Sequence, residues 1–195
     1  MMRRIDTGET VTAATAAIDR TTALATVFSD PPAFRAWYDT AVVRVYGYLH
    51  GRCGGDDALA EDLTQQTFIQ AIKHWQSYDG RADPITWLCS IARNKLTDHY
   101  RVLDRQERRH LRLVVREISV AEAAPVDAIA DRDAVLMALR NMPALHRAAL
   151  VLRYVDGLSL REVARELGRS ESATDSLIRR AKERFKATYP EAVDG

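Results

Sequence analysis

The chain has 195 residues, which is enough for one large or two small hydrophobic cores. Charged residues make up 28% of the sequence, but the formal net charge is only +1, which excludes the overall basic excess of a histone-like DNA binder. The two cysteines, Cys53 and Cys89, lack the spacing of a zinc site, and no apolar run is as long as a membrane span. We therefore expect a soluble cytoplasmic protein without a cofactor, a metal site or membrane insertion.

The N-terminal part of the chain predicts a lead-in followed by a helix. Residues 1–29 are rich in Ala and Thr and lack the apolar core of a signal peptide, so we expect a flexible lead-in. Apolar residues between Phe34 and Leu49 recur at helical spacing and predict a first helix. This helix ends at a glycine-rich turn over residues 51–55.

Two more helices and a loop complete this half. A capping aspartate after the turn begins a second helix, whose apolar side runs from Leu59 to Trp75 and includes Ile72. Residues 77–84 are rich in Gly, Asp and Pro and predict a loop. A third, longer helix carries an apolar stripe from Leu88 to Leu103.

A change of pattern follows this third helix. Residues 106–130 lose clear periodicity and contain the Ala-Glu-Ala-Ala-Pro stretch that ends at Pro125, which predicts a linker. A second helical unit starts near Asp131 and breaks at Pro143. It continues as a predicted helix from Ala144 to Tyr154.

Residues 158–186 predict a helix, a tight turn and a second helix. In the first helix, apolar residues at i, i+3, i+4 and i+7 form one buried face, and Ser159 with Glu162 forms a capping box. Gly168 supplies the left-handed residue that ends this helix, and Ser170 can cap the next one. The inward stripe of the second helix contains Leu177, Ile178, Ala181 and Phe185. Polar side chains near its start and basic ones further on suit entry into the DNA major groove with phosphate contact.

These observations predict an all-α protein of two small helical domains joined by a flexible linker. The N-terminal domain has three to four helices, and the C-terminal domain has four, including the helix-turn-helix. The expected organisation is a flexible lead-in at 1–29, a first domain at 30–105, a linker at 106–130, a second domain at 131–188 and a tail at 189–195.

Several segments, in this order and spacing, resemble bacterial sigma factors. Residues 60–68 read Ala-Glu-Asp-Leu-Thr-Gln-Gln-Thr-Phe, which is similar to the motif of that family that binds core RNA polymerase. Three short segments look like the promoter-melting part of the same family: Tyr-Asp-Gly-Arg at 78–81, Thr-Trp-Leu at 86–88 and Ile-Ala-Arg-Asn at 91–94. Residues 139–185 resemble its C-terminal domain. The match covers about residues 34–186 without the extra domains of housekeeping members, which is the arrangement of the extracytoplasmic-function (ECF) group.

The resemblance implies a docking face on the second helix. Asp62, Gln65, Gln66 and Ile69 lie opposite its apolar stripe, and Phe68 belongs to the same motif. The expected partners are the clamp helices of the largest polymerase subunit and the flap of the second-largest subunit. Gln66 stands where the family often has an acidic residue, so core binding is expected to be softened. Taken without the family, this face reads equally well as a solvated helix surface.

The resemblance also implies two promoter contacts. By this resemblance, aromatic side chains would stack on the single-stranded DNA of the −10 element, and basic side chains would follow its phosphates. One flipped nucleobase would lie near the loop. The residues carried over for the −10 element are Ser77, Tyr78, Asp79, Gly80, Arg81, Trp87, Arg93, Asn94, Lys95, Asp98 and Arg101. Those for the double-stranded −35 element are Arg169, Ser170, Glu171, Ser172, Asp175, Ser176, Arg179, Arg180 and Lys182.

The chain departs from the family in the second helix of its helix-turn-helix. Asp175 and Leu177 occupy positions that are commonly basic in the recognition helix of the family. An acid that faces the groove repels phosphate but can accept a hydrogen bond from cytosine N4. We therefore expect an unusual −35 preference or weaker binding at that element.

The leading interpretation is a transcription initiation subunit with no catalytic activity of its own. The resemblance makes an anti-sigma protein an expected partner, although no residue of this chain identifies it. The alternative is a stand-alone helix-turn-helix regulator that would need neither core polymerase nor the Asp62 and Gln65 face. An enzyme is disfavoured because the five histidines are scattered and accompany no nucleophile or metal-ligand motif.

Overall fold

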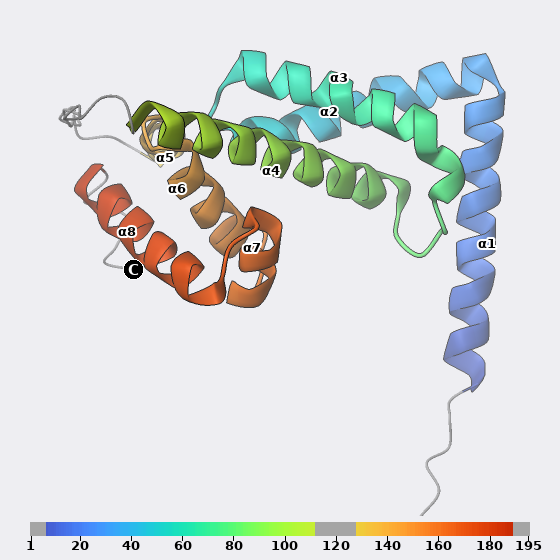
Figure 1. Cartoon of the computed structure of the whole chain (residues 1–195). Helices are drawn as coiled ribbons and strands as arrows, with labels where there is room; N and C mark the ends of the chain where they lie inside the picture. Colours follow the sequence, from blue (N-terminus) through green and yellow to red (C-terminus); the bar gives the residue numbers. More distant parts are fainter. Residues whose placement is uncertain (1–6, 112–127, 189–195) are drawn as a thin grey trace, which may run out of the picture. The chain divides into compact units, whose positions relative to one another are not determined.

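The computed structural model describes residues 7–111 and 128–188, and in these ranges every regular element is helical, which confirms the all-α class (Figure 1). The chain divides into two compact units. The first comprises Met1–Leu49 and Glu61–Lys95, and the second comprises His50–Ala60 and Leu96–Gly195. None of the helices in the described ranges is both long and apolar enough to cross a membrane.

The first unit is formed by the N-terminal helices. Their bounds are α1 Thr7–Ser29, α2 Pro31–Arg52, α3 Asp57–His74, the short 3₁₀ segment η1 Trp75–Ser77 and α4 Pro84–Leu111, of which α2, α3 and α4 continue into the second unit. Asp30 accepts a hydrogen bond from the backbone N–H of Ala33 and so caps α2. The core lies between α2, α3 and α4, and its buried side chains include Val45, Leu49, Leu63, Phe68, Leu88 and Ala92. Each large apolar side chain buried there contributes about 1.5–3 kcal/mol.

Helix α1 corrects the expectation of a flexible lead-in for residues 7–29. Leu24 is buried, and the ring of Phe28 stacks on Trp75 with 5.6 Å between centroids and lies 5.4 Å from Trp37. The hydroxyls of Thr21, Thr22 and Thr26 each donate to the carbonyl oxygen four residues back, so they are satisfied within the helix. Tertiary packing of a few apolar side chains therefore stabilises a helix that has little amphipathic pattern.

The second unit contains the C-terminal helices. Their bounds are α5 Ala128–Arg140, α6 Ala144–Leu150, the π-helical segment η2 Val151–Val155, α7 Leu160–Leu167 and α8 Glu171–Thr188. A buried cluster of Leu139, Met142, Leu150 and Ala181 joins α5, α6 and α8. The helix predicted for 144–154 is present, but its last turn widens into η2.

Both ends of the predicted linker are helical. Helix α4 continues to Leu111, and α5 begins at Ala128. Residues 112–127 of the predicted linker, and the predicted tail at 189–195, lie outside the described residues.

Candidate nucleic-acid interfaces and docking face

The turn between α7 and α8 has the geometry that its sequence predicts. The hydroxyl of Ser159 accepts from the Glu162 N–H at 3.3 Å, and the Glu162 carboxylate accepts from the Ser159 N–H at 2.8 Å, which confirms the capping box. Gly168 adopts φ +64°, and its N–H donates to carbonyls of the last turn of α7. Ser170 Oγ accepts from the Ala173 N–H at 3.3 Å and caps α8.

Helix α8 has one buried side and one exposed side. Thr174, Leu177, Ile178 and Ala181 are buried. Among the residues predicted to contact the −35 element, the exposed ones are Ser170, Glu171, Ser172, Asp175, Arg179, Arg180 and Lys182, and the partly buried ones are Arg169 and Ser176. The ammonium of Lys182 lies 5.6 Å from the ring centroid of Tyr154, which restrains it over an exposed aromatic face.

Leu177 and Asp175 lie on opposite sides of α8. Leu177 is 3% exposed, whereas Asp175 is exposed. Two positions along an α-helix correspond to a rotation of about 200°. Of these two departures from the family pattern, only Asp175 can therefore change the exposed surface of α8, and Leu177 belongs to the core.

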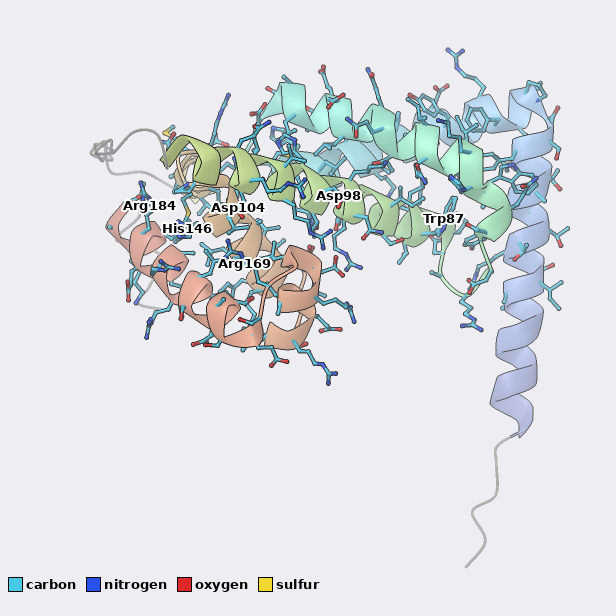
Figure 2. The ribbon with its side chains drawn as sticks, in the orientation of Figure 1. Trp87, Asp98, Asp104, His146, Arg169 and Arg184 are labelled. Carbon is cyan, nitrogen blue, oxygen red and sulfur yellow. The ribbon has the colours of Figure 1, made fainter. Side chains whose placement is uncertain are left out.

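Arg169, at the turn before α8, is paired within the second unit. Its guanidinium lies 3.2 Å from Oδ2 of Asp104, and the two side chains are 19% and 18% exposed (Figure 2). Arg101, one turn before Asp104 on α4, donates to Asp98 at 3.1 Å and to the carbonyl of Arg165 at 3.3 Å. In this conformation a DNA contact through Arg169 requires the Asp104 pair to break.

The loop between η1 and α4 has a buried frame and exposed side chains. Tyr78 is buried, its hydroxyl donates to the carbonyl of Ala82, and its ring lies 5.4 Å from that of Trp87. Burial raises the pKa of Tyr78 above its ordinary value of 10.0. Asp79 and Arg81 are exposed and form an ion pair at 3.3 Å.

The remaining residues predicted to contact the −10 element occupy successive turns of α4 and differ in exposure. Asn94 and Asp98 are exposed, whereas Arg93, Lys95 and Arg101 are partly buried. Ser77, which ends η1, is exposed, and Gly80 in the loop is buried. The loop and α4 thus provide a polar surface that contains both acids and bases.

The predicted docking face on α3 is exposed. Asp62, Gln65 and Gln66 are open to solvent, and the amide of Gln66 donates to the Asp62 carboxylate at 2.9 Å. Ile69 is about half exposed on the same face. Phe68 is buried instead, with its ring 4.7 Å from that of Tyr38. Its side chain packs beneath the docking face, which it can position without contacting a partner.

Ile72 departs from the expected apolar side of α3. The sequence pattern places it with the buried stripe, but the structure leaves about half of its surface exposed. It stands three residues after Ile69, so the two isoleucines are neighbours on the helix surface. The pair adds apolar area to an otherwise polar helix face.

Two family models match the chain. Sigma-70 region 2 matches residues 30–106, and Sigma-70, region 4 matches residues 132–185. The ECF RNA polymerase sigma factor SigM of Bacillus subtilis is 31% identical over 140 residues, which cover 71% of this chain and 85% of that protein. The chain belongs to the ECF sigma factor family.

Other relatives of this sigma factor extend the comparison. The ECF RNA polymerase sigma factor BldN of Streptomyces coelicolor is 34% identical over 167 residues, which cover 82% of this chain but 61% of BldN, so the chain spans less than two thirds of that relative. A solved structure of the sigma factor RpoE in complex with the anti-sigma factor NepR from Bartonella quintana aligns with a TM-score of 0.49 and 21% identity, over 83% of this chain and 98% of that one.

Two residues that contact the predicted site residues carry no signal in the sequence. Asp104 pairs with Arg169, and Arg20 of α1 donates to the loop between η1 and α4. Asp104 and Arg169 are 65 positions apart in the sequence, and Arg20 and Gly80 are 60 positions apart. No local pattern signals such a pairing.

The sigma factor should lose stability when the pH falls below about 6.5, because of His146. This residue lies on α6 near Arg184 of α8 (Figure 2), and burial, Arg184 and Arg180 lower its pKa from the ordinary 6.5. Between the lowered pKa and 6.5 the unfolded chain binds a proton that the folded chain does not, so stability is complete above this window and is lost as the pH falls through it. Thermal melts at pH 7 and at about pH 5 should show a smaller decrease in Tm for His146→Gln than for the wild type. Equal decreases would contradict this assignment.

Proposed function

We propose that this chain binds core RNA polymerase and directs promoter-specific initiation of transcription. Membership of the ECF family over both matched segments carries this proposal. The polymerase would catalyse nucleotide addition, and this chain would supply recognition only. Such a subunit acts in the cytoplasm, where core polymerase and chromosomal DNA are located.

In this proposal the exposed face of α3 docks on the clamp helices of the largest polymerase subunit. The Gln66 to Asp62 hydrogen bond fixes the Asp62 carboxylate on the helix surface, ready to accept from a partner. Ile69 and Ile72 supply apolar area next to it. A docking face that combines an apolar centre with fixed polar groups gives both affinity and register.

The loop after η1 and helix α4 are proposed to read the −10 element as single-stranded DNA. Asp79 and Arg81 stand exposed on the loop, while Tyr78 and Trp87 are packed against each other beneath them. Those two aromatic rings therefore support the loop, and Asn94 on α4 adds an exposed amide that can bond to bases.

Helix α8 is proposed to enter the major groove of the −35 element. Ser172 and Asp175 are exposed near its start, and Arg179 and Arg180 follow on exposed positions one to two turns later. The first pair can reach base edges, and the arginines can hold phosphates. Asp175 favours a cytosine at the position it meets and lowers affinity for other sequences. An anti-sigma protein is the further partner we propose for these surfaces.

Reconstitution with core polymerase tests this function. The purified chain and core polymerase should produce promoter-specific transcripts from genomic DNA, mapped by sequencing their start sites. Asp62→Arg and Gln65→Arg should each weaken core binding by about 30-fold or more, since they place a cation at the centre of the docking face. Their thermal melts should match the wild type because both positions are exposed.

The matched control is Asp39→Arg, the same charge reversal at an exposed position on α2. It should leave core binding unchanged. If the α3 variants bind core polymerase as the wild type does, the docking assignment is wrong. A chain that protects a palindromic operator without polymerase would instead support the stand-alone regulator.

A further inference from the structure

Helix α1 contacts the loop that is proposed to read the −10 element. The guanidinium of Arg20 donates to the carbonyl of Gly80 at 2.8 Å and to that of Arg81 at 3.1 Å. In Figure 1 the loop between η1 and α4 lies beside α1. Both contacts are within the first unit. A single charged side chain thus holds two consecutive carbonyl oxygens at the centre of the loop.

The backbones of α1 and the loop approach closely at Gly80. A Cβ built there would lie 2.0 Å from the carbonyl oxygen of Ala17 and 2.6 Å from the Thr21 hydroxyl. Gly80 also has a backbone φ of +70°, a conformation that residues other than glycine rarely adopt. No side chain fits between helix and loop, so the loop rests directly on α1.

The C-terminal part of helix α1, from Arg20 onward, is itself packed against the first unit. Leu24 is buried one turn after Arg20, and Phe28 contacts the rings of Trp75, Phe34 and Trp37 at centroid distances of 5.4–5.6 Å. Trp75 begins η1, the segment that leads into the loop. The helix therefore contacts the loop at Gly80 and the segment before it at Trp75.

The position of α1 leaves the polar side chains of the loop accessible. Arg20 bonds to backbone oxygens only, while Ser77, Asp79 and Arg81 remain exposed. A helix that covered the reading surface would bury these side chains. The contact instead supports the loop from its backbone side, which favours a positioning role over an inhibitory one.

We infer that α1 supports the loop between η1 and α4 that is proposed to read the −10 element, and that Arg20 is a positioning residue for this loop. This inference rests on the proposed function, and it concerns a helix that precedes the residues matched by Sigma-70 region 2. Arg20 restricts the loop to one backbone conformation before DNA arrives, so binding does not have to order it. Loss of Arg20 therefore weakens −10 binding and leaves core binding unchanged.

The test uses holoenzyme assembled from the full-length chain and core polymerase. The probe is a fluorescent single-stranded oligonucleotide that carries the non-template −10 sequence of a promoter mapped with the wild-type holoenzyme. Arg20→Ala should lower affinity for this probe by about 10-fold, since two charge-assisted hydrogen bonds to the loop are lost. Arg20→Lys keeps one charged donor group and should recover part of the loss.

Controls separate positioning from general damage. Asp19→Ala, at the neighbouring exposed position of α1, should bind the probe as the wild type does. Core binding and the thermal melt of Arg20→Ala should stay close to those of Asp19→Ala. In a double-mutant cycle, Arg20→Ala and Gly80→Ala should be non-additive, because both act on one contact.

Three results would overturn the inference. The first is an unchanged affinity of Arg20→Ala for the probe. The second is an increased affinity of Arg20→Ala, which would mean that α1 covers the loop. The third is a loss of affinity in Asp19→Ala equal to that in Arg20→Ala. Absence of promoter-specific transcripts with the wild type would instead remove the proposed function itself. An active wild type with an unaffected Arg20→Ala would remove only the role of α1.

Discussion

Replacing Leu177 by lysine should unfold the helix-turn-helix rather than tighten its hold on DNA. The side chain is 3% exposed, between residues that join α8 to the rest of its unit. The substitution removes the packing of a buried leucine, worth about 2–5 kcal/mol, and adds the cost of burying an ammonium. The total approaches the whole stability of a small domain. Circular dichroism melts and urea titrations of the full chain measure this effect.

Asp175→Lys is the matched variant, because it introduces the same side chain two positions earlier on the exposed side of α8. It should keep the wild-type melt and bind duplex DNA more tightly. The slope of log K against log salt should become steeper by about 1 if the new cation neutralises one phosphate. If Leu177→Lys melted as the wild type does, the buried side of α8 would be misassigned.

The helix-turn-helix was predictable because its signals are local. A capping box needs two residues three positions apart, and a left-handed C-terminal residue needs one glycine. Ser159, Glu162 and Gly168 satisfy these conditions in the sequence and in the structure. The buried side of α8 follows from periodicity alone, which predicts Leu177 and Ile178 in the core, where the structure has them.

Helix α1 was not predictable because its stabilising contacts are long-range. Its sequence is mostly Ala and Thr, and its contacts with the rest of the unit include those of Phe28 with Trp75 and of Arg20 with Gly80. These partners lie 47 to 60 positions away, and their meeting depends on the packing of α2 and α3. Periodicity describes which side of a helix is apolar, but it cannot tell which helix will cover that side.

The end of α6 was also beyond the reach of periodicity. A π-helical turn continues the apolar pattern of Val151 and Leu152 while shifting the residues that follow. Asp156 comes at the end of this turn, where its N–H donates to the carbonyl of Val151 at 2.9 Å. Its carboxylate then meets Arg52 of the same unit, a contact over 104 positions.

Asp156→Ala should lower the free energy of unfolding by about 3–5 kcal/mol, because it removes the carboxylate that accepts two hydrogen bonds from the Arg52 guanidinium in a largely buried site. Nε and Nη2 of Arg52 donate to one carboxylate oxygen at 2.8 and 2.5 Å, and the two side chains are 16% and 6% exposed. Thermal and urea unfolding of the full chain measure the loss. Asp156→Asn keeps an acceptor of similar shape and should lose less.

The control removes a carboxylate from an ion pair on the surface. Arg35 and Asp39 lie 3.5 Å apart on α2, with side chains 80% and 61% exposed, so Asp39→Ala should cost at most about 1 kcal/mol. Replacing both Arg52 and Asp156 by leucine should recover much of the stability lost in Asp156→Ala, since both charges of this ion pair are then removed together. Equal, small losses in Asp156→Ala and Asp39→Ala would show that Arg52 is solvated in solution. A large loss in Asp156→Ala that the double substitution reverses would identify the buried charge, and not lost packing, as its cause.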